Sequence, residues 1–262
     1  EGAIIPDCKI FYSTISVLEF GRIGIKCGKM KKTNGYGQFC PVSKAAEVLA
    51  VKWTPVIIRE LLCGSYRFND LKKGVPLMSP SLLSTRLQEL EWAGIIRREA
   101  ARKGKGSEYY LTEAGEALRP IIEMQGTWAQ SWLEQDLQDK DLDPSLLMWD
   151  MHRNIDFDYI PEDRRFVVQF EFSGVPIKQR RWWLLMDNKT VDVCLKDPGY
   201  EIDVFVSSSI RTMAEIWMGK RKINEALGDG DLLLDGERDI CREFPKALKL
   251  SLFAPTDASN RT

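Results

Sequence analysis

The chain has 262 residues, of which 44% are hydrophobic, and its formal net charge is −1. This length favours two domains, and the balanced charge argues against a protein that coats nucleic acid through bulk charge, so any DNA contact must come from a local basic face. A single histidine, His152, and six cysteines without CxxC spacing argue against histidine-based catalysis and zinc sites, so we predict no enzyme, metal or cofactor, and reduced thiols in a cytoplasm.

Residues 1–38 are predicted to be an N-terminal extension outside the fold. The apolar run at 10–20 is flanked by Asp7 and Glu19 and is interrupted by serines and threonines. It is therefore neither a convincing signal peptide nor long enough to span a bilayer, and we expect no membrane partner. Met30 and the two lysines after it resemble a native start, so the residues before Met30 are interpreted as an extension.

Apolar residues at helical spacing predict short helices in the next segment. The first covers 46–50, and the second covers 56–62 with Thr54 as its N-cap and Pro55 in its first turn. Gly64 ends the second helix, and a third short helix follows it.

A fourth, amphipathic helix is predicted over 79–93, with Pro80 in its first turn. Its leucines at i, i+4 and i+7 form one buried stripe. The opposite face is polar and available to base edges, and it carries Ser81, Ser84, Thr85 and Gln88. Any surface helix carries a polar face, so this feature alone leaves an ordinary surface helix as an alternative.

A basic hairpin is predicted directly after this helix, at 94–112. Its basic side chains are Arg97, Arg98, Arg102, Lys103 and Lys105, and Gly104 and Gly106 allow a tight tip. A winged helix has this arrangement: the helix enters the major groove and the hairpin reaches a phosphate strand. A plain exposed loop is the alternative. The predicted DNA contacts are Ser79, Ser81, Ser84, Thr85, Arg86, Gln88, Lys103 and Lys105.

One long helix is predicted from Thr112 to about Leu133. Its apolar stripe includes Ile121, Trp128 and Trp132. Large aromatic residues on such a helix favour burial against a partner, and a homodimer would place two recognition helices about one DNA turn, roughly 34 Å, apart. Packing on the chain's own core is the alternative.

Several motifs in this half occur in a recognisable order. They are Cys40-Pro41-Val42-Ser43, Lys52-Trp53-Thr54, Arg67-Phe68-Asn69-Asp70-Leu71, Ser79-Pro80-Ser81-Leu82-Leu83-Ser84 and Leu111-Thr112-Glu113-Ala114-Gly115. Together they resemble the HxlR family of winged-helix transcriptional regulators over about 39–132. The resemblance implies a dimeric bacterial or archaeal regulator with its DNA-binding domain at 39–133.

Three residues bear on what the resemblance implies. Val51 stands where the family usually has glycine, and Ser81 stands where a basic residue is common, so an operator sequence does not transfer from relatives. Cys40 matches an N-terminal cysteine that some relatives use to sense oxidants or electrophiles. The alternative for Cys40 is a packing cysteine at a helix start.

The second half is predicted to be a separate domain at 150–254, after an acidic linker at 134–149 and before a tail at 255–262. Alternating apolar residues predict strands around 166–172, 181–186, 190–195, 202–206 and 231–234. Helices are predicted at 208–218, in a shorter segment that ends at Gly228, and at 238–248, so the fold class is α+β, with helices on a mainly antiparallel sheet. Three aspartates near His152, namely Asp150, Asp156 and Asp158, are interpreted as solvated linker residues without a catalytic role.

A second resemblance rests on Arg180-Arg181-Trp182-Trp183-Leu184, Val204-Phe205-Val206, Trp217-Met218-Gly219 and Leu232-Leu233-Leu234-Asp235-Gly236. These motifs resemble a sterol carrier protein-like domain, which implies an apolar tunnel for a hydrophobic small molecule. The same side chains could equally fill a solid core. The predicted pocket residues are Phe170, Phe172, Trp183, Leu185, Val204, Val206, Trp217 and Leu227.

The sequence therefore predicts a dimeric, sequence-specific DNA-binding transcriptional regulator in the cytoplasm. Its expected partners are double-stranded DNA, a second copy of the chain and a hydrophobic small molecule bound by the C-terminal domain. The alternative is a carrier of a lipid-like molecule in which the winged helix serves only assembly.

Overall fold

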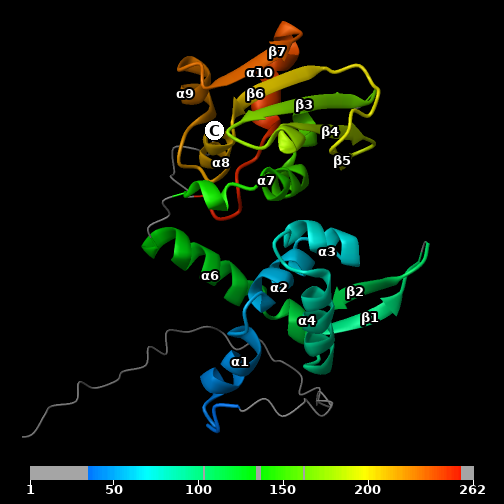
Figure 1. The fold of residues 1–262 in the computed structure, drawn as a ribbon, viewed down its shortest axis with the longest axis vertical. Helices are drawn as coiled ribbons and strands as arrows, with labels where there is room; N and C mark the ends of the chain where they lie inside the picture. The colour runs from blue at the N-terminus through cyan, green and yellow to red at the C-terminus, as the bar shows by residue number, and fades with distance from the viewer. Residues whose placement is uncertain (1–34, 103, 134–136, 162, 255–262) are drawn as a thin grey trace, which may run out of the picture.

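The computed structural model describes residues 35–102, 104–133, 137–161 and 163–254, and it places them in two packed parts (Figure 1). The first part contains α1 (Pro41–Leu49), α2 (Thr54–Leu62), α3 (Phe68–Gly74), α4 (Pro80–Trp92), β1 (Ile96–Ala100), β2 (Ser107–Leu111), α5 (Glu113–Glu116) and α6 (Arg119–Trp132).

The predicted helices of the first part are present, with changes at their ends. The first helix is longer than predicted because Pro41, at its first position, has a fixed φ suited to a helix start. Thr54 is not the N-cap of α2: it is the first helical residue, and Trp53 precedes it in the left-handed region with a φ of 79°. The cap of α4 is confirmed, since the Ser79 hydroxyl accepts a hydrogen bond from the Leu82 amide.

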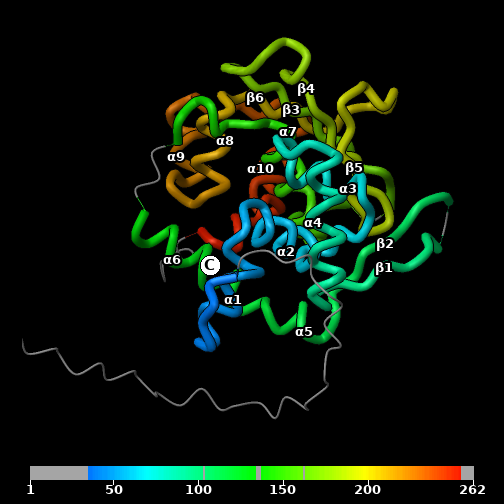
Figure 2. Tube along the Cα trace, turned by 60° about the horizontal axis from the view of Figure 1, so that its bottom comes forward, coloured from blue at the N-terminus to red at the C-terminus, as the bar shows by residue number. Residues whose placement is uncertain are grey.

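The predicted hairpin is confirmed and projects from the body in both views (Figures 1 and 2). Ile96 pairs with Leu111 at its base, and both are buried. Gly104 and Gly106, near the tip, have φ values of 85° and 123°, which side chains with a Cβ rarely adopt. Two of the basic residues in the hairpin, Arg97 and Arg98, are exposed.

The prediction of a single long helix from Thr112 is wrong. The chain forms α5, capped by the Thr112 hydroxyl, and then a separate α6 that begins at Arg119. Pro120 explains the break, since it lacks an amide hydrogen and its ring is tolerated only in the first turn of a helix. Ile122 is the buried residue of α6, and it packs with α2, α3 and α4 in the core of the first part.

The second part contains a five-stranded sheet and four helices. Its elements are α7 (Pro144–Met151), β3 (Phe166–Ser173), β4 (Arg181–Asp187), β5 (Thr190–Cys194), β6 (Val204–Ser209), α8 (Ile210–Trp217), α9 (Ile223–Gly228), β7 (Leu232–Gly236) and α10 (Arg238–Ala247), with 3-10 turns at Asp139–Asp141, His152–Asn154, Phe157–Tyr159 and Ile177–Gln179.

The strand order is β5-β4-β3-β6-β7, and β3 pairs in parallel with β6 while the other pairs are antiparallel. The predicted α+β class is confirmed, and the sheet is mixed, with three antiparallel pairs of strands and one parallel pair. Side chains from α7, α8 and α10 share one core with the inner face of this sheet, and Figure 1 shows these helices on the same side of it.

The predicted linker at 134–149 contains a helix of the second part. Leu147 and Met148 of α7 are buried in the core beneath the sheet, and the Asp143 side chain caps the helix by accepting a hydrogen bond from the Ser145 amide. The C-terminal part therefore begins no later than residue 144, because α7 supplies part of its core. The acidic composition of 134–143 concealed this boundary.

The two parts touch at several places. Helix α3 packs against α7, and Figure 2 shows the two side by side. Farther along, Phe253 lies against Gly126 of α6, where an added Cβ would approach the phenyl ring to 2.2 Å. Glycine at this position permits the close contact. No helix within the described residues is long and apolar enough to cross a membrane.

Candidate nucleic-acid interface

The polar face of α4 is exposed as predicted. Ser81, Ser84, Thr85 and Gln88 all lie on the surface, while Leu83, Leu87 and Leu90 on the other face are buried. The burial of three leucines fixes the rotation of the helix, and this rotation determines which side chains face outward. The structure therefore brings the four candidate base contacts onto one side of α4.

Some hydroxyls on or next to this face already form hydrogen bonds within the helix, and others do not. Ser79 uses its oxygen in the cap of α4 and lies 3.2 Å from the Ser81 hydroxyl. Thr85 donates to the Ser81 carbonyl at 3.1 Å. By contrast, Ser84 and Gln88 have no side-chain hydrogen bond to any described residue, so they are the side chains most available to base edges.

Arg86 lies away from this face. Its guanidinium contacts the Glu89 carboxylate, and its Nε donates to the Lys52 carbonyl at 3.3 Å. Because the guanidinium already has a carboxylate partner, a phosphate would compete with Glu89 for it, and Arg86 as a phosphate contact stays a prediction. The side chain also ties α4 to the turn between α1 and α2.

Near its tip the hairpin has two exposed cations, Arg102 and Lys105, and neither has an ion-pair partner among the described residues. Lys103, also predicted as a contact, lies outside the described residues. Arg97 donates to the Leu111 carbonyl at 2.7 Å and pairs with Glu99, and Arg98 donates to the Ser107 hydroxyl. These arginines therefore brace the hairpin while remaining exposed.

A network that the sequence analysis missed anchors the hairpin base. Glu108 is buried, accepts a hydrogen bond from the Tyr110 hydroxyl at 2.7 Å and pairs with Arg67 at 3.2 Å. The Tyr110 hydrogen bond, with help from Arg67, lowers the pKa of Glu108. Tyr66 stacks on Tyr110 with ring centroids 5.7 Å apart. A charged residue inside the apolar alternation of β2 is the signal that could have revealed it.

Helix α6 presents an unpartnered apolar stripe. Ile121, Met124, Trp128 and Trp132 recur at spacings of three and four residues, and all are exposed. Phe39 and Val42, at the start of α1, are exposed too. The alternative, in which these aromatic residues pack on the chain's own core, is therefore not observed, and exposed apolar patches of this kind mark interaction sites.

Comparison with known proteins places this arrangement in a family. The HxlR-like helix-turn-helix family matches residues 48–137. The HTH-type transcriptional regulator YvaP of Bacillus subtilis, described as uncharacterized, is 36% identical over 104 residues, which is 39% of this chain and 96% of YvaP. The chain belongs to the HxlR-like helix-turn-helix family.

Two further likenesses cover the same half of this HxlR-family protein. The HTH-type transcriptional regulator YodB of Bacillus subtilis is 32% identical over 97 residues, 36% of this chain and 87% of YodB. The match to the solved structure of reduced YodB covers 37% of this chain and 97% of the YodB chain, with a TM-score of 0.33. The family match and the sequence similarity to YvaP and YodB identify the N-terminal part as a helix-turn-helix domain of the transcriptional-regulator type, and the mixed sheet of the C-terminal part lies beyond the family match.

Charge is divided between the two halves of the HxlR-family chain. Residues 35–133 contain 13 lysines and arginines against 10 aspartates and glutamates, whereas residues 137–254 contain 17 against 22. The helix-turn-helix half is therefore the cationic one, although the whole chain is almost neutral. This division favours phosphate contact by the N-terminal half.

Cys40 lies at the N-terminal end of α1. Hydrogen bonds from the Ser43 and Val42 amides lower the pKa of its thiol. A lowered pKa raises the fraction of thiolate, which is the reactive form. Redox sensing by Cys40 stays a prediction.

A buried ion pair joins the two parts of the protein. Glu60 of α2 is fully buried, and Arg153 of the C-terminal part donates to its carboxylate at 2.5 Å. Trp149 Nε1 donates to the same carboxylate at 3.2 Å, and Arg59 pairs with it at 2.6 Å. Burial alone would raise the pKa of Glu60, but the hydrogen bond and charge of Arg153, with those of Arg59, hold it below its ordinary value.

His152 and Asp150 are half-buried at the boundary between the two parts and are not solvated linker residues, whereas Asp158 is exposed as predicted. His152 lies against Trp149 with ring centroids 4.3 Å apart, and its Nδ1 contacts the Trp149 carbonyl. Burial lowers the pKa of His152 to about 4. Burial also raises the pKa of Asp150, more than the nearby Arg59 lowers it. No cluster of metal-ligating side chains was found within the described residues.

We expect His152 to make stability depend on pH. Because its pKa is lowered to about 4 in the folded protein, the unfolded chain binds more protons below pH 6.5, and stability falls as the pH falls toward 4. The free energy of unfolding should drop by about 2 kcal/mol from pH 7 to pH 5 through this residue alone. Urea unfolding of the wild type and of His152→Gln at both pH values measures the effect. An equal drop in both proteins would contradict it.

The predicted hydrophobic pocket is not assembled as one cavity. Side chains alternate along β4, so Trp182 and Leu184 face the core, whereas Trp183 and Leu185 lie on the opposite face of the sheet. The remaining six pack in or against the core; they are Phe170, Phe172, Val204, Val206, Trp217 and Leu227. Phe170 lies 5.9 Å from Phe172 and 6.5 Å from Phe244, so aromatic rings fill this interior.

Proposed function

We propose that the protein is a sequence-specific DNA-binding transcriptional regulator that acts as a homodimer. The observation that carries this is the polar face of α4 beside a hairpin with an exposed Lys105 at its tip, in a domain of the HxlR-like family. Ser84 and Gln88 are the primary base contacts, with Ser81 and Thr85 beside them. Ser79 positions the start of the helix, and Lys105 with Lys103 provides phosphate contacts.

The homodimer is proposed from the apolar stripe of α6. Four exposed apolar side chains on one face, together with Phe39 and Val42 on the same half of the chain, exceed the scattered single residues expected on a monomer. A two-fold assembly would present two α4 helices to neighbouring turns of one DNA face.

DNase footprinting on the DNA upstream of the gene for this protein tests the function. A protected site supports the proposal, whereas a carrier of a hydrophobic molecule would protect none.

We expect Gln88→Ala to lower discrimination between the site and mutated sites by about 1–3 kcal/mol, because a bidentate amide contact to adenine is lost. Gln138→Ala, at an exposed position outside the interface, is the matched control. Equal discrimination by wild type and Gln88→Ala would remove Gln88 from the site.

The hairpin contact has a separate test. Each phosphate neutralised by a lysine releases counterions, so Lys105→Ala should weaken binding to all sequences and reduce the slope of log affinity against log salt by about 1 per protomer. Lys196→Ala, an exposed lysine of the C-terminal part, should leave the slope unchanged. Fluorescence anisotropy at several salt concentrations gives both values, and an unaltered slope in Lys105→Ala would reject the contact.

The C-terminal part stays a candidate ligand sensor and a candidate sterol carrier-like domain. Its apolar interior supports this, while the contacts between Phe170, Phe172 and Phe244 favour a filled core. Native mass spectrometry of the purified protein tests it, and the absence of a co-purifying hydrophobic molecule would favour a structural role.

A further inference from the structure

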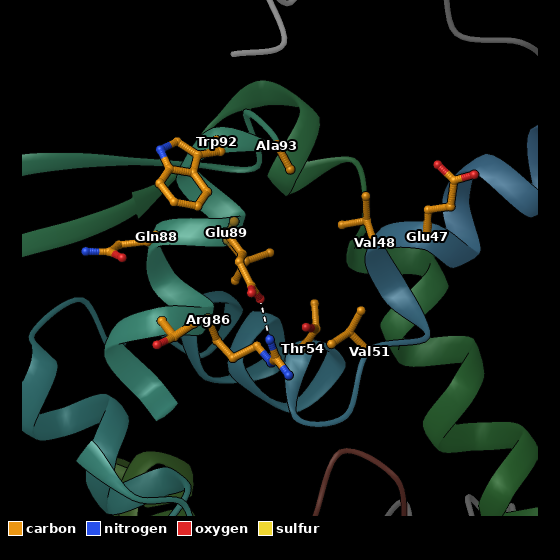
Figure 3. A pocket seen from close by; sticks show the side chains of 11 residues that line it. Glu47, Val48, Val51, Thr54, Arg86, Gln88, Glu89, Trp92 and Ala93 are labelled. Carbon is orange, nitrogen blue, oxygen red and sulfur yellow. Dashed lines mark hydrogen bonds and ion pairs between the residues drawn. The ribbon is translucent and has the colours of Figure 1, made fainter. Parts of the chain in front are cut away.

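A pocket of about 550 Å³ lies between α1 and α4 (Figure 3). Its lining comes from three helices and one turn: Val48 on α1, Val51 in the turn that follows, Thr54 on α2, and Arg86 and Trp92 on α4. Its volume falls within the range of sites that hold small molecules, roughly 300–1,000 Å³. Two of the proposed base contacts, Thr85 and Gln88, also border this space.

The pocket has a buried floor and an aromatic rim. Leu90 and Thr54 are buried at its base, whereas Trp92 at the rim is 46% exposed. Valines and an alanine supply much of the remaining wall. An exposed indole next to an apolar hollow offers a surface on which a flat ring can stack.

The charged groups at the rim are already paired. Glu47 accepts hydrogen bonds from Lys44 Nζ at 2.9 Å and from the Tyr36 amide at 3.2 Å. The Arg86 guanidinium contacts the Glu89 carboxylate, as the dashed line in Figure 3 shows. A charged guest would lose its hydration and find no free counter-charge, so the lining favours a neutral molecule.

We propose that this pocket binds a neutral, planar aromatic small molecule that stacks on Trp92 between α1 and α4. Such a guest touches the flank of α4 that carries Arg86 and Glu89, and it also borders Thr85 and Gln88 (Figure 3). The guest and DNA therefore share part of one helix, so binding of either one is thermodynamically linked to binding of the other. This consequence rests on the proposed function, whereas binding of the guest does not.

Isothermal titration calorimetry of the full chain with naphthalene-2-carboxamide tests the site. We expect saturable binding, at least tenfold tighter than binding of the equally shaped anion 2-naphthoate or the cation 2-naphthylmethylammonium. Val48→Trp fills the pocket and should abolish binding, while Ala45→Trp, on an exposed position of the same helix, should change it less than twofold. Trp92→Ala, at a half-exposed position where folding is little affected, should weaken binding about threefold to tenfold.

Three results would overturn the site: no saturable binding of the carboxamide, unchanged binding by both Val48→Trp and Trp92→Ala, or equal affinity for a charged analogue. The affinity for the footprinted DNA is measured separately, with and without saturating carboxamide. A change of at least threefold supports the link to DNA, and no change overturns that link. Absence of any footprint would instead contradict the proposed function and leave the calorimetric result intact.

Discussion

Replacing Arg153 by methionine should destabilise the protein by about 3 kcal/mol, because the buried Glu60 carboxylate loses one of its two arginine partners and keeps Arg59. Glu60 is fully buried, and Arg153 approaches it at 2.5 Å, while its other contacts come from Arg59, Trp149 and Ser65. Gly74 of α3 closes the remaining side, since an added Cβ there would meet a Glu60 oxygen at 1.9 Å. Water therefore has little access to the Glu60 carboxylate.

The double variant Glu60→Met with Arg153→Met distinguishes two free energies: the loss of stability when Glu60 keeps its charge without Arg153, and the stabilisation that the ion pair itself contributes. When both charges are replaced by apolar groups of similar size, a buried pair is often neutral or even unfavourable. Arg59 then keeps only Asp150, at 3.9 Å, as a charged partner among the described residues, so we expect the double variant to regain part of the stability lost in Arg153→Met. Thermal and urea unfolding of the three proteins measure the difference.

A matched control lies on the outer surface. Arg165 pairs with Asp187 at 3.0 Å, but both side chains are more than a third exposed, so Arg165→Met should cost no more than about 1 kcal/mol. Equal losses in Arg153→Met and Arg165→Met would contradict a special role for the buried pair. A double variant no more stable than Arg153→Met would show that the pair itself contributes.

The Glu60 network also has a consequence for the link between the two parts. Helix α2 carries Glu60 and packs in one core with α4, whereas Arg153 directly follows α7 of the C-terminal part. The ion pair thus connects the core beneath the candidate DNA-binding helix to the core beneath the mixed sheet. Its loss should loosen the C-terminal part without altering the residues on the polar face of α4.

Local signals in the sequence predicted the elements that local chemistry determines. Ser79 and Pro80 define the start of α4, its three leucines define the buried face, and glycines near the hairpin tip allow its turn. These features depend on neighbours within a few residues. The polar face of α4 could therefore be predicted before any tertiary contact was known.

Features that depend on distant partners could not be predicted. Glu60 finds Arg153 93 residues away, and Arg86 turns to the Lys52 carbonyl 34 residues away. Helix α7 was hidden because its buried face is defined by a sheet that comes later in the chain. The prediction that Trp183 faces the interior is wrong. Both Trp182 and Trp183 are apolar, so the alternation of polar and apolar residues along the strand does not show which of the two faces the core.

Trp128→Asp should convert the proposed homodimer to a monomer. Trp128 lies in the middle of the apolar stripe of α6 and is 55% exposed in one copy. Buried tryptophans are frequent hot spots of interfaces, and losing one costs about 2–4 kcal/mol, which raises the dissociation constant roughly 30-fold to 1,000-fold. The aspartate adds the cost of desolvating a charge at the interface. Sedimentation equilibrium of wild type and variant gives the dissociation constants.

The same variant tests how the dimer reaches DNA. A site with two half-sites about one turn, roughly 34 Å, apart is bound by two linked α4 helices, so the monomer should lose most of its affinity for the full site while keeping its affinity for a single half-site. Leu233→Asp, at a position 58% exposed on β7, is the control for an aspartate on an apolar surface residue and should leave both values unchanged. A Trp128→Asp protein that stays dimeric would exclude this face of α6 from the assembly, and a monomer with full affinity for the paired site would show that each chain binds alone.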